Sequence, residues 1–130
     1  MNVIAVPVSP GEVIDKITIL EIKSERIADA AKLAHIRDEL HMLEDTWARA
    51  AAGEADIGSE RARLKKVNEA LWEIEDAIRL QEKAASFGER FIELARSVYV
   101  RNDERAAIKR EINDKLGSRL VEEKSYEDYR

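Results

Sequence analysis

The apolar seam in the last third of the sequence ends in cations, and cations on a helix seam can bind anions. Phe91, Leu94 and Val98 follow heptad spacing, and the next two seam positions are Arg101 and Arg105. A buried guanidinium needs a carboxylate or an anionic ligand, because an unpaired buried charge is costly. The seam therefore predicts either an internal ion pair or an anion site.

Beside this seam runs a polar stripe, formed by Asn102, Arg105, Lys109 and Asn113. Two interpretations stay open. In the first, Glu21, which lies on the apolar face of an N-terminal helix, pairs with an arginine inside the fold and fixes the helix register. In the second, Arg101, Arg105 and Lys109 line a pocket for an anionic metabolite.

A second possible chemistry is metal binding on one helix face, where Asp38, His41 and Asp45 lie together. Asp-x-x-His is similar to the Glu-x-x-His spacing of di-iron bundles, whose ligands project inward. The heptad register set by Leu40 and Leu43 places all three residues at outer positions. We therefore expect a solvated acidic face, no metal and no cofactor, and a fully buried Leu40.

The motifs of common enzyme classes do not occur in the sequence. There is no cysteine, so thiol nucleophiles, disulfides and thiolate zinc sites are excluded. No serine lies in a Gly-x-Ser-x-Gly motif, and there is no glycine-rich phosphate loop. Whether the protein is an enzyme stays open, and binding is favoured over catalysis.

The composition favours long helices as the elements that position these residues. Roughly half of the chain is Ala, Glu, Lys, Leu or Arg, which is typical of long helices. Charged residues make up 38% and aromatic residues 5%, so the core must be aliphatic. The 130 residues fit a single domain, residues 1–130.

Charge and hydropathy narrow the expected location and partners. A net charge of -5 disfavours nucleic acids and anionic membranes as partners. No apolar run approaches the ~20 residues of a membrane span, and the N-terminus lacks the basic region of a signal peptide. We expect a cytoplasmic protein.

The first helix is marked by a capping box at residues 9–12, with Ser9 as N-cap, Pro10 at the first helical position and Glu12 at the third. This helix is apolar on two sides, with Ile19 and Ile22 opposite the main face, so we expect it to be central. Residues 1–8 form a short extended, β-prone segment. Its expected partner is Leu120-Val121 in the tail or a second copy of the chain.

Three or four further helices are predicted from heptad seams and caps. Their landmarks are a seam over 33–50 that Asp29 can cap, a seam over 64–78, an interruption at 86–88, a cap at Asn102-Asp103, a stop at Gly117 and a tail over 118–130. We therefore predict an all-α fold, an up-and-down bundle of four to five helices with a short extended N-terminal segment.

Motifs at both ends of the sequence are similar to those of a known family. They comprise Val6-Pro7-Val8-Ser9 through Gly11-Glu12, residues 14–23 (Ile-Asp-Lys-Ile-Thr-Ile-Leu-Glu-Ile-Lys), Asn102-Asp103-Glu104-Arg105-Ala106, residues 109–113, Gly117-Ser118 and residues 122–126. The chain resembles an uncharacterised bacterial family of about this length, a domain of unknown function. The resemblance implies no activity. It does imply a setting, because relatives lie beside, or are fused to, glycosyltransferase or helical-repeat proteins of surface-polysaccharide pathways.

The family motifs overlap the unusual positions found by periodicity. The candidate ligand-binding residues are therefore Lys16, Glu21, Arg101, Asn102, Arg105, Lys109 and Asn113. The leading functional prediction is a non-enzymatic interaction or accessory module that acts as a homodimer, because Trp72 and the second apolar side of the first helix favour a partner. The alternative is a small cofactor-free bundle enzyme or sensor that binds an anionic metabolite.

Overall fold

The computed structural model describes residues 2–129, apart from the side chain of Ala51. Its elements are α1 (Pro10–Arg26), α2 (Ala30–Arg49), the short 3-10 helix η1 (Ala51–Glu54), α3 (Gly58–Lys83) and α4 (Glu89–Lys115). Residues 2–129 contain no strand. The all-α prediction is confirmed, with four α-helices. None of the described helices is long and apolar enough to cross a membrane.

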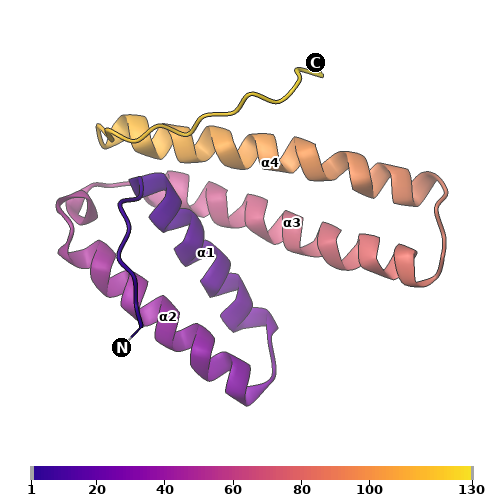
Figure 1. Ribbon diagram of the computed structural model, residues 1–130, viewed down its shortest axis with the longest axis horizontal. Coiled ribbons are helices and arrows are strands. Elements are labelled where there is room, and N and C mark those ends of the chain that lie inside the picture. Colours follow the sequence, from indigo (N-terminus) through magenta and orange to yellow (C-terminus); the bar gives the residue numbers. More distant parts are fainter. Residues whose placement is uncertain (1, 130) are drawn as a thin grey trace.

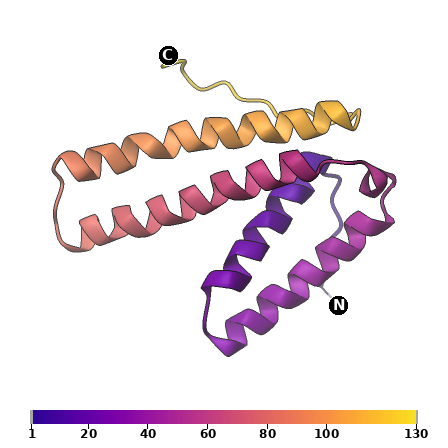
Figure 2. The ribbon, with the colours of Figure 1, turned by 180° about the vertical axis from the view of Figure 1, so that it is seen from behind.

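The helices form two hairpins of unequal length. Helices α3 and α4 make a long antiparallel hairpin, and the shorter α1–α2 hairpin lies against the end of it that is remote from the α3–α4 turn (Figure 1). Helix α1 contacts all three other helices, whereas α2 lies mainly against α1. Seen from behind, the turn end of α3–α4 extends well beyond α1 and α2 (Figure 2). Helix α1 is the central element, as its two apolar sides predict.

Local capping signals explain where the helices begin and end. The Ser9 hydroxyl accepts a hydrogen bond from the Glu12 amide at 3.2 Å, and Asp29 caps α2 through the Lys32 amide at 2.9 Å. Gly117 follows α4 with a positive φ of 63°, which closes the helix. Both predicted N-caps and the predicted stop are therefore confirmed.

Helix α4 differs from its prediction because it is continuous from Glu89 to Lys115. The break at residues 86–88 is confirmed, but Asn102-Asp103 starts no new helix. An asparagine can cap a helix, yet the antiparallel packing on α3 holds these residues in helical conformation. Arg105 is consequently in the middle of α4 and not near a helix start.

The core is small and lies where α1 meets the base of the α3–α4 hairpin. Its buried residues are Ile14, Ile17, Ile57, Leu64, Val67, Ile108 and Ile112. The prediction that Leu40 is fully buried is wrong: Leu40 is half-buried, and α2 has no fully buried residue. The heptad seam of α2 is correct, but a helix that packs mainly on one neighbour covers only part of its seam.

The two terminal segments lie apart and do not pair. Residues 2–8 are extended and exposed along α2, while residues 118–129 run back along α4 (Figure 1). The expected pairing of the N-terminal segment with Leu120-Val121 is therefore wrong. Met1 and Arg130, the outermost residues of the two predicted terminal segments, lie outside the described residues.

Gly11 sets the distance between α1 and α4. A Cβ at this position would lie 2.6 Å from the carbonyl oxygen of Lys109 and 2.9 Å from Oδ1 of Asn113. The Gly11 amide donates a hydrogen bond to that Oδ1 at 2.8 Å. The first turn of α1 can therefore approach α4 only without a side chain.

We predict that Gly11→Ala destabilises the protein by ~1–3 kcal/mol, because the new methyl group forces the two backbones apart. Gly58→Ala is the matched control, since its Cβ would meet nothing closer than 3.5 Å at the exposed start of α3. Urea unfolding of both variants measures the difference. Equal stability of the two variants would show that the close approach is not required.

Candidate functional site

The carboxylate of Asp15 joins three helices. Asp15 is on α1 and 1% exposed. Its Oδ1 accepts hydrogen bonds from Arg105 Nε on α4 and from Asn68 Nδ2 on α3, both at 2.9 Å, and its Oδ2 pairs with the second nitrogen of the Arg105 fork. The buried charge is therefore both neutralised and hydrogen-bonded, which is what burial of a carboxylate requires.

Thr18 and Asn68 complete this buried network. The Thr18 hydroxyl donates to the Asp15 carbonyl at 2.8 Å and accepts from Asn68 Nδ2 at 3.0 Å. Asp15, Thr18 and Asn68 are not among the candidate residues predicted from the sequence. The signal was present: Asp15 and Thr18 interrupt the apolar face that carries Ile14 and Ile17.

Glu21 does pair with an arginine, as the first interpretation predicts, but that arginine is not Arg105. Glu21 pairs with Arg61 of α3 at 3.1 Å, and Arg105 pairs with Asp15. The reason is where the helices meet: α4 approaches the N-terminal half of α1, and the C-terminal half of α1 lies against α3. The hydrogen bond to Asp15 raises the pKa of Arg105 further, and burial opposes it only in part. Arg105 therefore stays charged.

Lys109 lies one turn beyond Arg105 and is 6% exposed. Its Nζ contacts Glu12 at 2.7 Å and Glu122 of the C-terminal segment at 3.3 Å. Burial lowers the pKa of Lys109, but the hydrogen bond to Glu12 and the nearby carboxylates outweigh it, and the net pKa is raised. The Glu12 carboxylate therefore pairs with Lys109, while the backbone amide of Glu12 donates to the Ser9 hydroxyl that caps α1.

The remaining candidates lie in different places. Asn113 is buried and binds Gly11, and its Nδ2 has no hydrogen-bond partner among the described residues. Lys16 is exposed and pairs with Glu39, and Arg101 is exposed and pairs with Glu104. The fold thus brings Arg105, Lys109 and Asn113 together but leaves Lys16, Glu21 and Arg101 apart from them.

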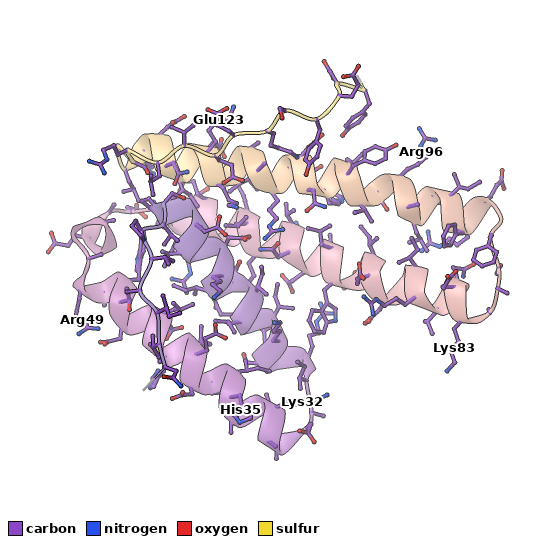
Figure 3. All side chains as sticks on the ribbon, in the orientation of Figure 1. Lys32, His35, Arg49, Lys83, Arg96 and Glu123 are labelled. Carbon is purple, nitrogen blue, oxygen red and sulfur yellow. The ribbon has the colours of Figure 1, made fainter. Side chains whose placement is uncertain are left out.

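Charged side chains outside this cluster project from the outer surfaces. Lys83 and Arg96 on the α3–α4 hairpin and His35 on α2 point away from the helix contacts (Figure 3). Asp38, His41 and Asp45 are exposed along α2. This is the solvated acidic face that their heptad positions predict.

A hollow of about 310 Å³ lies beside the buried network, between α1, α3 and α4. Its polar lining consists of Asn68, Glu75, Asn102 and Arg105, and its apolar lining of Ile19, Ile22, Leu71, Trp72 and Val98. Asn102, a sequence candidate, therefore lies at this hollow next to Arg105. The arrangement offers hydrogen-bond donors above an apolar wall, which is a binding geometry and not an array of acid, base and nucleophile.

Comparison with known proteins gives a family but no activity. The model of a family described as "Family of unknown function (DUF6165)" matches residues 4–129. The chain belongs to this family. The expectation that the chain belongs to an uncharacterised family, a domain of unknown function, is thereby confirmed. No curated protein and no solved structure matches the DUF6165 chain.

We predict that Arg105→Ala destabilises the protein by ~3–5 kcal/mol, because it leaves the buried Asp15 carboxylate without its cation. Arg90→Ala is the matched control on the same helix: Arg90 forms an exposed pair with Glu93 and should cost at most ~1 kcal/mol. Urea unfolding measures both variants. Similar losses in the two would contradict the central role of the Asp15–Arg105 pair.

The raised pKa of Lys109 predicts a loss of stability in alkali. A group whose pKa is higher in the folded state stabilises the fold fully below its unfolded pKa, about 10.4 for lysine, and this contribution is lost as the pH rises through the folded pKa. Lys109→Met should remove this part of the pH dependence. Unfolding free energies measured from pH 8 upward for both proteins test it, and parallel curves would argue against the ion pairs of Lys109.

Proposed function

We propose that this DUF6165 protein is a non-enzymatic interaction or accessory module that acts as a homodimer. The observation that carries the proposal is its exposed surface of 9,225 Å². A compact monomer of 14.8 kDa exposes about 7,000 Å². The excess of about 2,200 Å² exceeds the ~800 Å² that each partner buries in a standard interface.

Part of the exposed apolar surface lies on the distal hairpin, residues 79–95. Leu80, Phe87 and Ile92 are all more than half exposed, and Leu94 is the one fully buried apolar residue of the described core in this segment. The hairpin projects beyond α1 and α2 (Figure 2). Exposed apolar area of this kind marks interaction surfaces.

A groove along α3 and α4 suits a second copy. It has a volume of about 510 Å³ and an apolar floor of Val67, Ala70, Ala107 and Ile108. The two alanines allow a helix to come close, since interaxial distance depends on the side chains at the contact.

The rim of the groove carries both signs of charge. Arg63 pairs with Glu111 across it at 2.8 Å, and Arg101 pairs with Glu104 at 3.0 Å. Under a two-fold axis each basic group can face an acidic group of the other copy, which is the self-complementarity that an isologous interface requires. This mixed rim favours a second copy over a strongly charged partner.

The ion pairs weigh against the alternative of an enzyme or sensor in which Arg101, Arg105 and Lys109 bind one anion. Glu104 occupies Arg101, and two carboxylates occupy Lys109. A ligand would have to displace these internal partners. The setting we propose, beside the enzymes of surface-polysaccharide biosynthesis, rests on the resemblance of the end motifs.

We predict a particle of about twice 14.8 kDa by light scattering at micromolar concentration. Ala107→Glu should give monomers, because it places a charge on the apolar floor of the groove. Ala34→Glu on the exposed side of α2 is the matched control and should stay dimeric. A monomeric natural chain would overturn the dimer, and a dimeric Ala107→Glu variant would move the interface away from this groove.

A further inference from the structure

The hollow beside the buried network has the features of a small-molecule site. Its volume of about 310 Å³ is at the lower end of ligand pockets. It is lined by residues of α1, α3 and α4 and does not involve the groove proposed for the second copy. A ligand there would be held by the same three helices that the Asp15 network fixes.

Arg105 lines this hollow and has an unused edge. A guanidinium has five N–H donors, and Asp15 takes Nε and one side of the fork. No hydrogen bond of the remaining terminal nitrogen occurs among the described residues, and the side chain is 30% exposed. Asp15 thus acts as an orienting partner that holds the guanidinium rigid while the other edge stays available to an acceptor.

Asn102 lies one turn before Arg105 and adds a second free polar group. Its side-chain amide has no hydrogen-bond partner among residues 2–129 although the residue is half-buried. The amide NH₂ can donate to an acceptor that also meets Arg105. Asn102 and Arg105 both line this hollow, so two donors on α4 border the same space.

Most of the remaining lining is apolar. Ile19 and Ile22 come from α1, Leu71 and Trp72 from α3, and Val98 from α4. The carboxylate of Glu75 lies at the same hollow but pairs with Arg79 at 2.8 Å. Arg105 is therefore the one cation in the lining. Its ion-pair partner, Asp15, is buried in the protein.

We propose that this hollow binds a small carboxylate with an apolar body of a few carbon atoms. A carboxylate matches the planar edge of a guanidinium and can accept from the Asn102 amide as well. The apolar body lies against Trp72 and the aliphatic wall, which gains free energy by leaving water. The site uses Asn102 and Arg105 of the sequence candidates, and neither Lys109 nor Arg101 lines it.

The test uses hexanoate as the probe, with hexanamide and hexylamine as neutral and cationic controls. Binding is followed by NMR through the indole N–H of Trp72; the chain has two tryptophans, and Trp47→Phe assigns the signals. A probe of this size should bind with a Kd of about 1 mM. We expect saturable shifts of Trp72 and of the Asn102 amide with hexanoate, and weaker binding of the two controls.

Two variants locate the site. Asn102→Ala removes a side chain that binds nothing in the fold, so the protein should stay folded and bind hexanoate several-fold more weakly. Arg105→Lys keeps the charge beside Asp15 but loses the fork and should weaken binding about tenfold. Arg96→Lys, which changes an outward-pointing arginine of the same helix, is the matched control and should bind like the natural chain (Figure 3).

Three outcomes would overturn the proposal. The first is no saturable shift of Trp72 at about ten times the expected Kd. The second is equal or tighter binding of hexanamide or hexylamine, which would show that the carboxylate is not recognised. The third is unchanged hexanoate affinity in a folded Asn102→Ala variant. None of these outcomes depends on whether the chain dimerises.

Discussion

A single buried carboxylate determines how the helices of this protein are placed. Asp15 is 1% exposed, and the free energy cost of burying its charge is offset only where Arg105 and Asn68 reach it together. These residues belong to three helices, so the requirement fixes the position of α1 along α3 and along α4 at once. Apolar packing alone tolerates sliding and repacking far better than a bidentate ion pair does.

Further polar contacts lie near Asp15, along the interface between α1 and α4. Gly11 lets the first turn of α1 approach Asn113, and Glu12 reaches Lys109 one turn from Arg105. The C-terminal segment joins these contacts through Glu122, which also contacts Lys109. Helix α2 adds little to them, because its contacts are mainly with α1. The polar contacts between α1 and α4 therefore determine which arrangement of the helices forms. The small aliphatic core beneath these contacts provides much of the buried apolar surface.

Most of the local structure could be predicted from the sequence, but less of the candidate site could. Caps at Ser9 and Asp29 and the stop at Gly117 depend on a few neighbouring residues, and so they could be predicted. Heptad spacing places Arg105 on the inner face of its helix. It does not predict the position along the two helices at which α1 and α4 cross, here called the height of the crossing. That height decides between Asp15 and Glu21, which lie nearly two turns apart on α1.

The same limit explains the other differences. A heptad pattern identifies the face of α2 that packs but not how many helices cover it, so Leu40 is only half-buried. The cap signal at Asn102 is a local preference, and packing on α3 overrides it. The hollow beside Arg105 arises where three helices meet, and periodicity along any one of them does not show it.

The distal hairpin has a further consequence for the architecture. Arg26 at the end of α1 reaches Glu73, and the α3–α4 pair continues beyond this contact to its turn without cover from α1 or α2 (Figure 1). Adding or removing one heptad in each helix at the turn would change its reach by about 10 Å while keeping the apolar seam in phase. The base of the hairpin, where Asp15 fixes the register, would not change. The hairpin can therefore serve as a spacer whose length is set independently of the folded base.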